Sequence, residues 1–200
     1  MSKWKEKLSE FDTPDNNKQI LAYMRDMVML IAGVLLVFSL CLRVVVVSGP
    51  SMNNTLYDGD WLVVVNNLFY KEPKAGDIVV ASKDAFENGN PIIKRVIATE
   101  GQVVDIDFTA GIVYVDGVAL DEPYTLTPTN LSEGVPFPVT VSEGSLFVMG
   151  DNRNGSKDSR SYEIGLVDKR EILGRAVFLV FPGTSNGRID RDFSRMGVLS

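Results

Sequence analysis

The sequence predicts a mainly β protein: an N-terminal transmembrane helix followed by an all-β, barrel-like domain with an inserted β subdomain. Two observations lead to this prediction. One uncharged apolar run, residues 27–42, lies near the N-terminus. Beyond it, short stretches rich in valine and isoleucine alternate with glycine-containing turns, which is typical of antiparallel strands. The chain has 200 residues, 45% of them hydrophobic, which is enough for one anchored domain with a sizeable core.

The beginning of the chain predicts a tail and a membrane span. Residues 1–19 are polar and rich in turn formers, so we expect a loose cytoplasmic tail. We expect residues 20–43 to form the transmembrane helix. The uncharged run reaches about 24 Å at 1.5 Å per residue, somewhat short of a roughly 30 Å hydrocarbon core. Arg25 and Arg43 could lengthen the span by snorkelling.

Two other interpretations of the apolar run remain open. It could be a buried core helix, although it is apolar on all faces rather than on one. It could also be a cleavable signal peptide, although its polar leader is long and no A-x-A-like cleavage site follows it. A membrane anchor fits the pattern better than either, so we expect membrane lipid as a partner.

Basic residues indicate the orientation of the helix. Five of them precede the uncharged run: Lys3, Lys5, Lys7, Lys18 and Arg25. After Arg43 the next basic residue is Lys71. Because lysine and arginine near a span favour the cytoplasmic side, we predict a single-pass protein of the cell membrane with a cytoplasmic N-terminus. Residues 44–200 would then form an extracytoplasmic domain.

Eight stretches of this domain are predicted as strands, because they are short, apolar and rich in β-branched residues. They are residues 44–47, 61–65, 78–81, 92–98, 103–106, 112–115, 146–149 and 175–181. Turns are expected at residues 58–59, 75–76, 88–89 and 116–117, each of which contains a glycine. The segment at about 107–143 is richer in threonine, proline and glutamate, and we expect it to form the inserted subdomain.

Two absences restrict the chemistry. The sequence contains no histidine, which excludes a Ser-His-Asp triad, a Cys-His dyad and histidine ligands to a metal. Its single cysteine, Cys41, lies in the apolar run, so neither a disulfide within the chain nor thiol or zinc chemistry is expected. The net charge of −6 argues against nucleic acid as a partner. We therefore expect no metal, no cofactor and no nucleic acid.

Four motif blocks stand out in the domain: SGPSMNNTL at 48–56, GDIVV at 76–80, IIKRVIATEG at 92–101 and GDNRNGSKDSR at 150–160. Taken alone, Ser51 is a turn serine after Gly-Pro and Lys94 is a strand lysine. Together and in this order, the blocks resemble the type I signal peptidases of peptidase family S26. That family shows S-M-x-P-T-L, G-D-[IV]-[IV], K-R-[VI] and G-D-N-R-x-N-S-x-D-S-R. The resemblance covers roughly residues 20–182.

The resemblance implies a membrane-bound serine endopeptidase that cleaves N-terminal signal peptides from secreted precursor proteins, which would be its partners. It implies Ser51 as the nucleophile and Lys94 as the general base. The hydroxyl of Ser156 would orient the lysine amine, and Asp158 and Arg160 would form a structural ion pair near the site. The oxyanion donor would be the backbone N–H of Ser51.

The surroundings of Lys94 suit a base. A lysine can accept a proton only when it is neutral, and burial in an apolar setting lowers the pKa of a lysine because it penalises the ammonium ion. In a strand, Lys94 would share a face with Ile92 and Val96, which provide such a setting. The other interpretation is that Lys94 extends into solvent while Arg95, on the opposite face, pairs with an acid.

The strands beside the two reactive residues predict a substrate site. An extended peptide laid between residues 44–47 and 92–93 would pair through its backbone. We expect this peptide to contact Val45, Val47, Met52, Ile92 and Ile93. Alternate side chains of a strand point the same way, so shallow pockets would admit small residues at alternate positions, as in the Ala-x-Ala preference of the family. For Met52, core packing is the alternative.

The chain departs from the family pattern at four positions. Asn54 stands where the family usually has proline, and Gly155 stands where it has asparagine. Ala98 and Gln102 replace a common glycine and aspartate. None of these changes removes a catalytic group, but Asn54 lacks the fixed φ of proline.

Two rival functions belong to other classes. A few relatives of the family lack catalysis and act as chaperone-like binding factors, but this chain retains both Ser51 and Lys94. Self-cleaving regulators use the same Ser–Lys chemistry, but they are soluble and carry a DNA-binding domain. The apolar run of this chain and its lack of a basic helix-turn-helix argue against that class.

Overall fold

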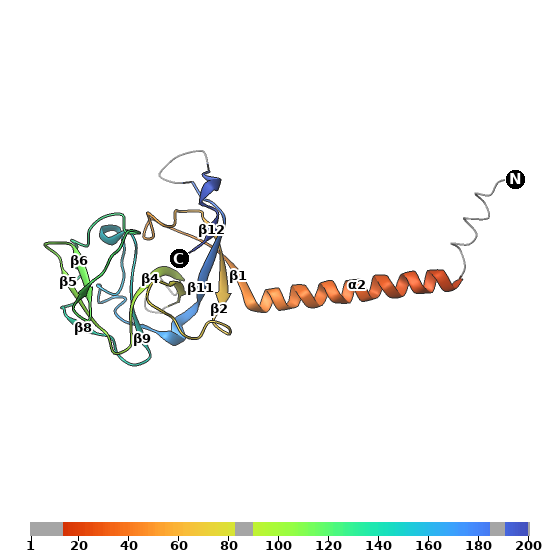
Figure 1. Ribbon diagram of the computed structural model, residues 1–200, viewed down its shortest axis with the longest axis horizontal. Coiled ribbons are helices and arrows are strands. Elements are labelled where there is room, and N and C mark those ends of the chain that lie inside the picture. The colour runs from red at the N-terminus through yellow and green to blue at the C-terminus, as the bar shows by residue number, and fades with distance from the viewer. Residues whose placement is uncertain (1–13, 83–89, 185–190, 200) are drawn as a thin grey trace. The chain divides into compact units, whose positions relative to one another are not determined.

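The computed structural model describes residues 14–82, 90–184 and 191–199 (Figure 1). Residues 1–13 of the expected tail and the expected turn at 88–89 lie outside the described residues. The chain divides into two compact units, Met1–Cys41 and Leu42–Ser200. The apolar helix belongs to the first unit, and the strands belong to the second.

The apolar helix, α2, spans Pro14–Cys41. It begins earlier than the expected range of 20–43, because a proline in the first helical turn lacks only an N–H that would have no intrahelical partner there. Leu42 and Arg43, which were expected in the helix, belong to a strand instead. Among the described residues, the part Asn17–Cys41 is the one helix long and apolar enough to cross a membrane. Its length and composition alone would also suit a signal sequence.

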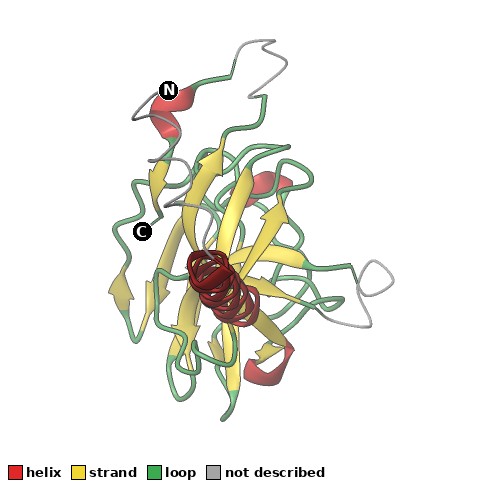
Figure 2. Cartoon of the chain, turned by 90° about the vertical axis from the view of Figure 1, so that its right-hand side faces the viewer, coloured by secondary structure: helices red, strands yellow, loops and turns green. Residues whose placement is uncertain are grey.

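The larger sheet is antiparallel and has eight strands (Figure 2). In sheet order they are β1 (Leu42–Val46), β2 (Trp61–Asn66), β11 (Ile172–Phe181), β3 (Ile78–Ala81), β4 (Ile92–Thr99), β9 (Ser145–Met149) and β10 (Val167–Asp168), with β12 (Gly197–Val198) paired to β11. Register shifts along β11 mark bulges, which bend a sheet. The last long strand of the chain therefore forms the middle of the sheet, between β2 and β3.

A smaller sheet has four strands. They are β7 (Val118–Ala119), β6 (Ile112–Val115), β5 (Val103–Asp107) and β8 (Val139–Thr140). This sheet begins at Val103, before the range 107–143 in which an inserted subdomain is expected.

Asp116 lies in the β6–β7 turn with a φ of 52°, and its carboxylate accepts a hydrogen bond from the Val103 N–H at 2.8 Å. That bond, followed by one from Gln102, lowers the pKa of Asp116.

The mainly β class with an apolar helix ahead of it is confirmed. Each of the eight predicted stretches overlaps a strand of the structure, with ends that differ by a few residues. The strands β7, β8, β10 and β12 were not predicted. They have two residues each, which is too short to show the alternation that identifies a strand.

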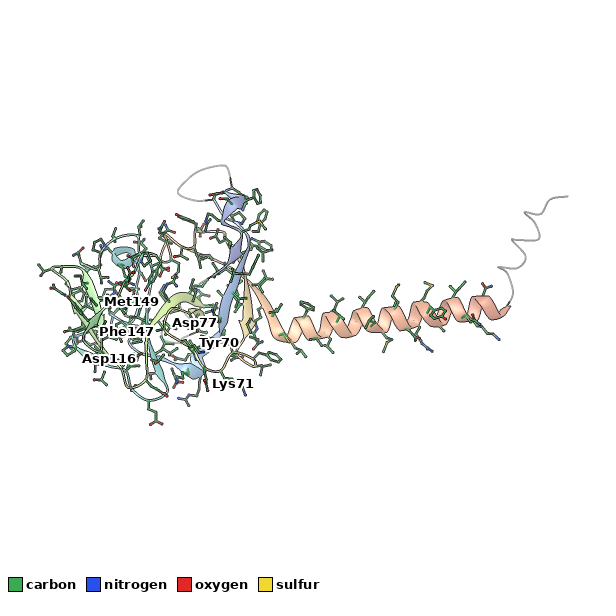
Figure 3. The ribbon with its side chains drawn as sticks, in the orientation of Figure 1. Tyr70, Lys71, Asp77, Asp116, Phe147 and Met149 are labelled. Carbon is green, nitrogen blue, oxygen red and sulfur yellow. The ribbon has the colours of Figure 1, made fainter. Side chains whose placement is uncertain are left out.

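Strand β4 is buried from Ile92 to Ala98, because three apolar clusters pack around it. Ile93 packs with residues of β2, and Val96 packs with residues of β9. Ile97 belongs to a third cluster with Phe147 and Met149 (Figure 3). Burying one such apolar side chain contributes about 1.5–3 kcal/mol. Lys94 and Arg95 are therefore buried because the apolar residues on either side of them in β4 pack into the core.

The start of β3 is stabilised by the carboxylate of Asp77, which belongs to the second motif block (Figure 3). It accepts hydrogen bonds from the Tyr70 hydroxyl at 2.5 Å and from the Lys74 N–H at 2.9 Å. It also pairs with Arg175 of β11 at 3.0 Å. Burial, followed by the contact with Asp77, raises the pKa of Tyr70. Asp77 of this motif block therefore connects β3 to β11 and to the segment that precedes β3.

Candidate active site

Residues 47–60 form the Ser51 loop, which connects β1 to β2. The Val47 N–H donates to the Asp60 carbonyl at 2.8 Å, so the two ends of the loop lie side by side. The Gly49 N–H donates to the Asp58 carboxylate at 2.8 Å. Gly49 has a φ of +85°, which residues with a side chain rarely adopt. These contacts close the loop into a compact unit and hold Ser51 in place.

The Ser51 loop and β4 bring Ser51 and Lys94 together. The Lys94 Nζ donates a hydrogen bond to the Ser51 Oγ at 2.9 Å. Lys94 is only 4% exposed, so it does not extend into solvent as one interpretation of the sequence expects. Within the described part of the chain, the Ser51 N–H donates to no protein group, which leaves it available to a bound molecule. The pair has the geometry of a nucleophile and its base.

A cleft of about 560 Å³ opens over this pair. Its lining includes all five residues expected to contact substrate: Val45, Val47, Met52, Ile92 and Ile93. Met52 also belongs to the core cluster beneath the loop, so the two interpretations of Met52 are not exclusive. Asn90, Pro91, Gly155 and Lys157 line the cleft as well. Asn90 and Pro91 were not singled out from the sequence, because nothing in their local pattern distinguishes them from loop residues. Gly155 and Lys157 belong to the fourth motif block, but neither was expected to line the cleft.

Asp158 and Arg160 form a fully buried ion pair in the fourth motif block. The Arg160 Nε and Nη2 donate to the two carboxylate oxygens of Asp158, each at 2.8 Å. The Gly150 N–H also donates to Asp158 at 3.0 Å, and Arg160 donates to the Arg153 carbonyl at 2.6 Å. The pair therefore fixes the turn between Gly150 and Arg160, which lies next to the Ser51 loop.

Ser156 and Ser51 lie on either side of Gly150. A Cβ on Gly150 would lie 2.2 Å from the Ser156 Oγ and 2.5 Å from the Ser51 carbonyl oxygen, so only glycine fits between the two serines. The Ser156 side chain is buried, and its Oγ lies 3.5 Å from the Lys157 carbonyl, a long hydrogen bond. Its role in orienting the Lys94 amine stays a prediction.

The Arg95–Asp151 ion pair connects all four motif blocks. One interpretation of the sequence paired Arg95 with an acid, but it identified neither Asp151 nor this connection. The Arg95 Nε and Nη2 donate to the Asp151 carboxylate at 2.9 and 2.8 Å. Asp151 also accepts a hydrogen bond from the Thr55 hydroxyl of the Ser51 loop, and Arg95 donates to the Gly76 carbonyl at 2.8 Å. The guanidinium of Arg95 lies 4.0 Å from the centre of the Tyr124 ring. The signal in the sequence was the charged Arg95 beside Lys94 in an apolar strand.

A sequence model described as signal peptidase, peptidase S26, matches residues 20–181 of the chain. The chain belongs to this signal peptidase family. The resemblance of the four motif blocks is thereby confirmed, as is the expected class of enzyme, a hydrolase of the signal peptidase I type.

Relatives in the signal peptidase family match most of the chain. A probable signal peptidase I-1 of Synechocystis is 39% identical over 78% of this chain and 82% of its own length. A signal peptidase I of Bacillus licheniformis is 32% identical over 88% of this chain and 96% of its own length. A crystal structure of a signal peptidase I from Enterococcus faecalis V583 is 30% identical and aligns with 52% of this chain and 97% of that chain, at a TM-score of 0.43.

The departures from the signal peptidase pattern have simple structural settings. The side chain of Asn54 is exposed, so it displaces nothing from the core. Ala98 is buried in the cluster that contains Phe147. Gln102 accepts a hydrogen bond from the Thr99 N–H at 2.9 Å and so holds the turn after β4. Gly155 is the one departure that lines the cleft, and a Cβ at this position would lie 2.5 Å from the Asn152 Nδ2.

Proposed function

We propose that this chain is a membrane-bound serine endopeptidase that removes N-terminal signal peptides from secreted precursor proteins, with Ser51 as nucleophile and Lys94 as general base. One observation carries the proposal: the Lys94 Nζ lies 2.9 Å from the Ser51 Oγ at a cleft lined by strand residues. Because the chain has no histidine, a buried lysine is the base available to this serine.

The proposed reaction needs a neutral Lys94 amine. Burial favours that form because the surroundings solvate an ammonium ion poorly. The amine takes the proton of the Ser51 hydroxyl as the Oγ attacks the peptide carbonyl, and the Ser51 N–H stabilises the oxyanion. The lysine then gives its proton to the leaving amine, which departs and leaves an acyl-enzyme. Water, deprotonated by the same amine, releases the acyl group and restores Ser51.

Strand pairing supports an extended pose for the substrate. Residues 92–94 of β4 pair with β3 on one side, whereas β9 joins the other side only from Arg95 onward. Among the described residues, no strand pairs with Ile92 and Ile93 on the side of the cleft, and β1 pairs with β2 alone. An extended peptide can add its own backbone hydrogen bonds at such edges.

The direct test is cleavage of a signal-peptide-bearing precursor by the purified full chain in detergent. We expect a shortened product whose new N-terminus follows a small-x-small sequence. N-terminal sequencing of that product identifies the cut. If the chain is correctly folded and leaves several such precursors intact, the proposal is wrong.

The extended pose predicts a pattern of substrate specificity. Leucine or phenylalanine immediately before the cut should block cleavage, and so should a bulky residue three positions before it, because both side chains point toward the same wall. The residue between them should tolerate large side chains because it faces away. A precursor series varied at these three positions measures the effect on kcat/KM. Equal sensitivity at all three positions would contradict the extended pose.

The proposed topology places the N-terminus in the cytoplasm and residues 44–200 outside the membrane, with lipid around α2. The basic residues ahead of the apolar run support it. Protease added to intact cells with a permeable wall should digest the region after residue 43 and spare the N-terminal tail. A cytoplasmic protein followed in the same sample shows whether the cells stayed intact. Complete protection of the domain in permeable cells would show that the orientation is reversed.

A further inference from the structure

The C-terminal residues 191–199 contact the Ser51 loop although they lie beyond the matched family region, which ends at residue 181. The Arg195 Nη2 and Nη1 donate to the two carboxylate oxygens of Asp60 at 2.5 and 3.1 Å. The Nη2 also lies 3.3 Å from the Thr55 carbonyl oxygen. One side chain from the end of the chain therefore contacts the Ser51 loop at two points.

Asp60 is the residue that closes the loop. Its carboxylate is fully buried and also accepts the Tyr57 N–H at 2.8 Å and the Gly183 N–H at 2.6 Å. Its carbonyl accepts the Val47 N–H from the other end of the loop. A buried carboxylate needs a partner of opposite charge, and Arg195 is that partner.

Two further contacts hold the C-terminal segment on the loop. The guanidinium of Arg195 lies 4.3 Å from the centre of the Tyr57 ring. Leu199 packs against the core cluster that contains Met52 and Leu56. Arg195 itself does not line the cleft, so its contacts act on the loop and not on a bound peptide.

We propose that Arg195 is a positioning residue that holds the Ser51 Oγ within reach of Lys94. The inference rests on the proposed function of that pair. Thr55 receives a contact from each side: its hydroxyl donates to Asp151, and its carbonyl accepts from Arg195. The loop is thus fixed between two arginine–aspartate pairs, one inside the motif blocks and one contributed by the C-terminal segment.

The kinetic test compares Arg195→Ala with Arg191→Ala. Arg191 is in the same segment, but its guanidinium donates to the Pro182 carbonyl and lies over the Phe181 ring, and it makes no hydrogen bond to the described residues of the Ser51 loop. We expect Arg195→Ala to lower kcat roughly 10- to 100-fold, because a displaced nucleophile loses its alignment, and to leave KM nearly unchanged. Arg191→Ala should keep the wild-type kcat. Equal kcat values in the two variants would overturn the inference.

Arg195→Lys covers the case in which Arg195→Ala does not fold, as judged by circular dichroism. Lysine keeps a cation beside Asp60 but lacks the planar fork that also reaches the Thr55 carbonyl. We expect an intermediate loss of kcat. If Arg195→Ala is unfolded and Arg195→Lys has the kcat of Arg191→Ala, the inference is wrong.

A second measurement does not depend on peptidase activity. In a Cys41→Ser, Ser51→Cys background, iodoacetamide reports the reactivity of the thiol at position 51, which a nearby lysine raises by favouring the thiolate. Adding Arg195→Lys should slow this alkylation, whereas adding Arg191→Ala should not. If the wild type cleaves no precursor, the proposed function fails, and this measurement still decides the inference. Equal alkylation rates after adding Arg195→Lys and after adding Arg191→Ala would overturn the inference.

Discussion

Replacing Ser51 or Lys94 with alanine is expected to abolish precursor cleavage, with a loss of on the order of 10⁴-fold or more in kcat/KM. Each change removes one member of a pair joined by a 2.9 Å hydrogen bond, and neither remaining side chain can activate the reaction alone. Lys94→Arg should fail as well, because a guanidinium stays protonated and cannot act as a base.

Matched surface variants control for handling and folding. Ser142→Ala and Lys71→Ala change the same residue types on the exposed surface, and both should keep wild-type activity. Circular dichroism of all variants shows whether the domain remains folded. More than a few per cent of wild-type activity in purified Ser51→Ala or Lys94→Ala would rule out the proposed chemistry.

Arg160→Ala is expected to cost about 3–5 kcal/mol in the free energy of unfolding. The substitution leaves the carboxylate of Asp158 buried without its partner and removes the hydrogen bond to the Arg153 carbonyl. The turn beside the Ser51 loop would lose its main support, so activity should fall along with stability. Denaturant titration of the full chain in detergent, followed by circular dichroism, measures the change.

Arg170→Ala is the matched control for this experiment. Arg170 forms a still shorter pair with Asp168, at 2.6 Å compared with 2.8 Å, but its side chain is exposed to solvent. Exposed pairs contribute little because water and salt screen them, so the midpoint of unfolding should not move measurably. Equal destabilisation by the two substitutions would show that burial does not determine the contribution of these pairs.

The long strands could be predicted because their signals are local, whereas Ser51 and Lys94 were named from the order of the four motif blocks and their roles stay a prediction. The run Ile92–Ile93 before Lys94, with Val96 after it, already indicates a buried lysine. The start of α2 at Pro14 was missed because the turn formers around it outweighed the tolerance of the first helical turn for proline.

The Asp158–Arg160 pair was expected and is present, but two other ion pairs around the site could not be predicted, because their partners are far apart in the sequence. Arg95 and Asp151 are separated by 56 positions, and Arg195 and Asp60 by 135. Nothing local distinguishes Arg195 from Arg191 four residues earlier, although only Arg195 contacts the Ser51 loop. Which charges meet is decided by the order of the strands in the sheet, and that order cannot be read from short patterns.

The position of β11 in the middle of the larger sheet has a consequence for biogenesis. Until residues 172–181 have been translated, β2 and β3 lack the strand that pairs with both of them and leave unpaired edges that invite aggregation. Pairing across such long separations is also slow. A newly made chain is therefore expected to remain inactive until residues 172–181 have been translated and have paired with β2 and β3.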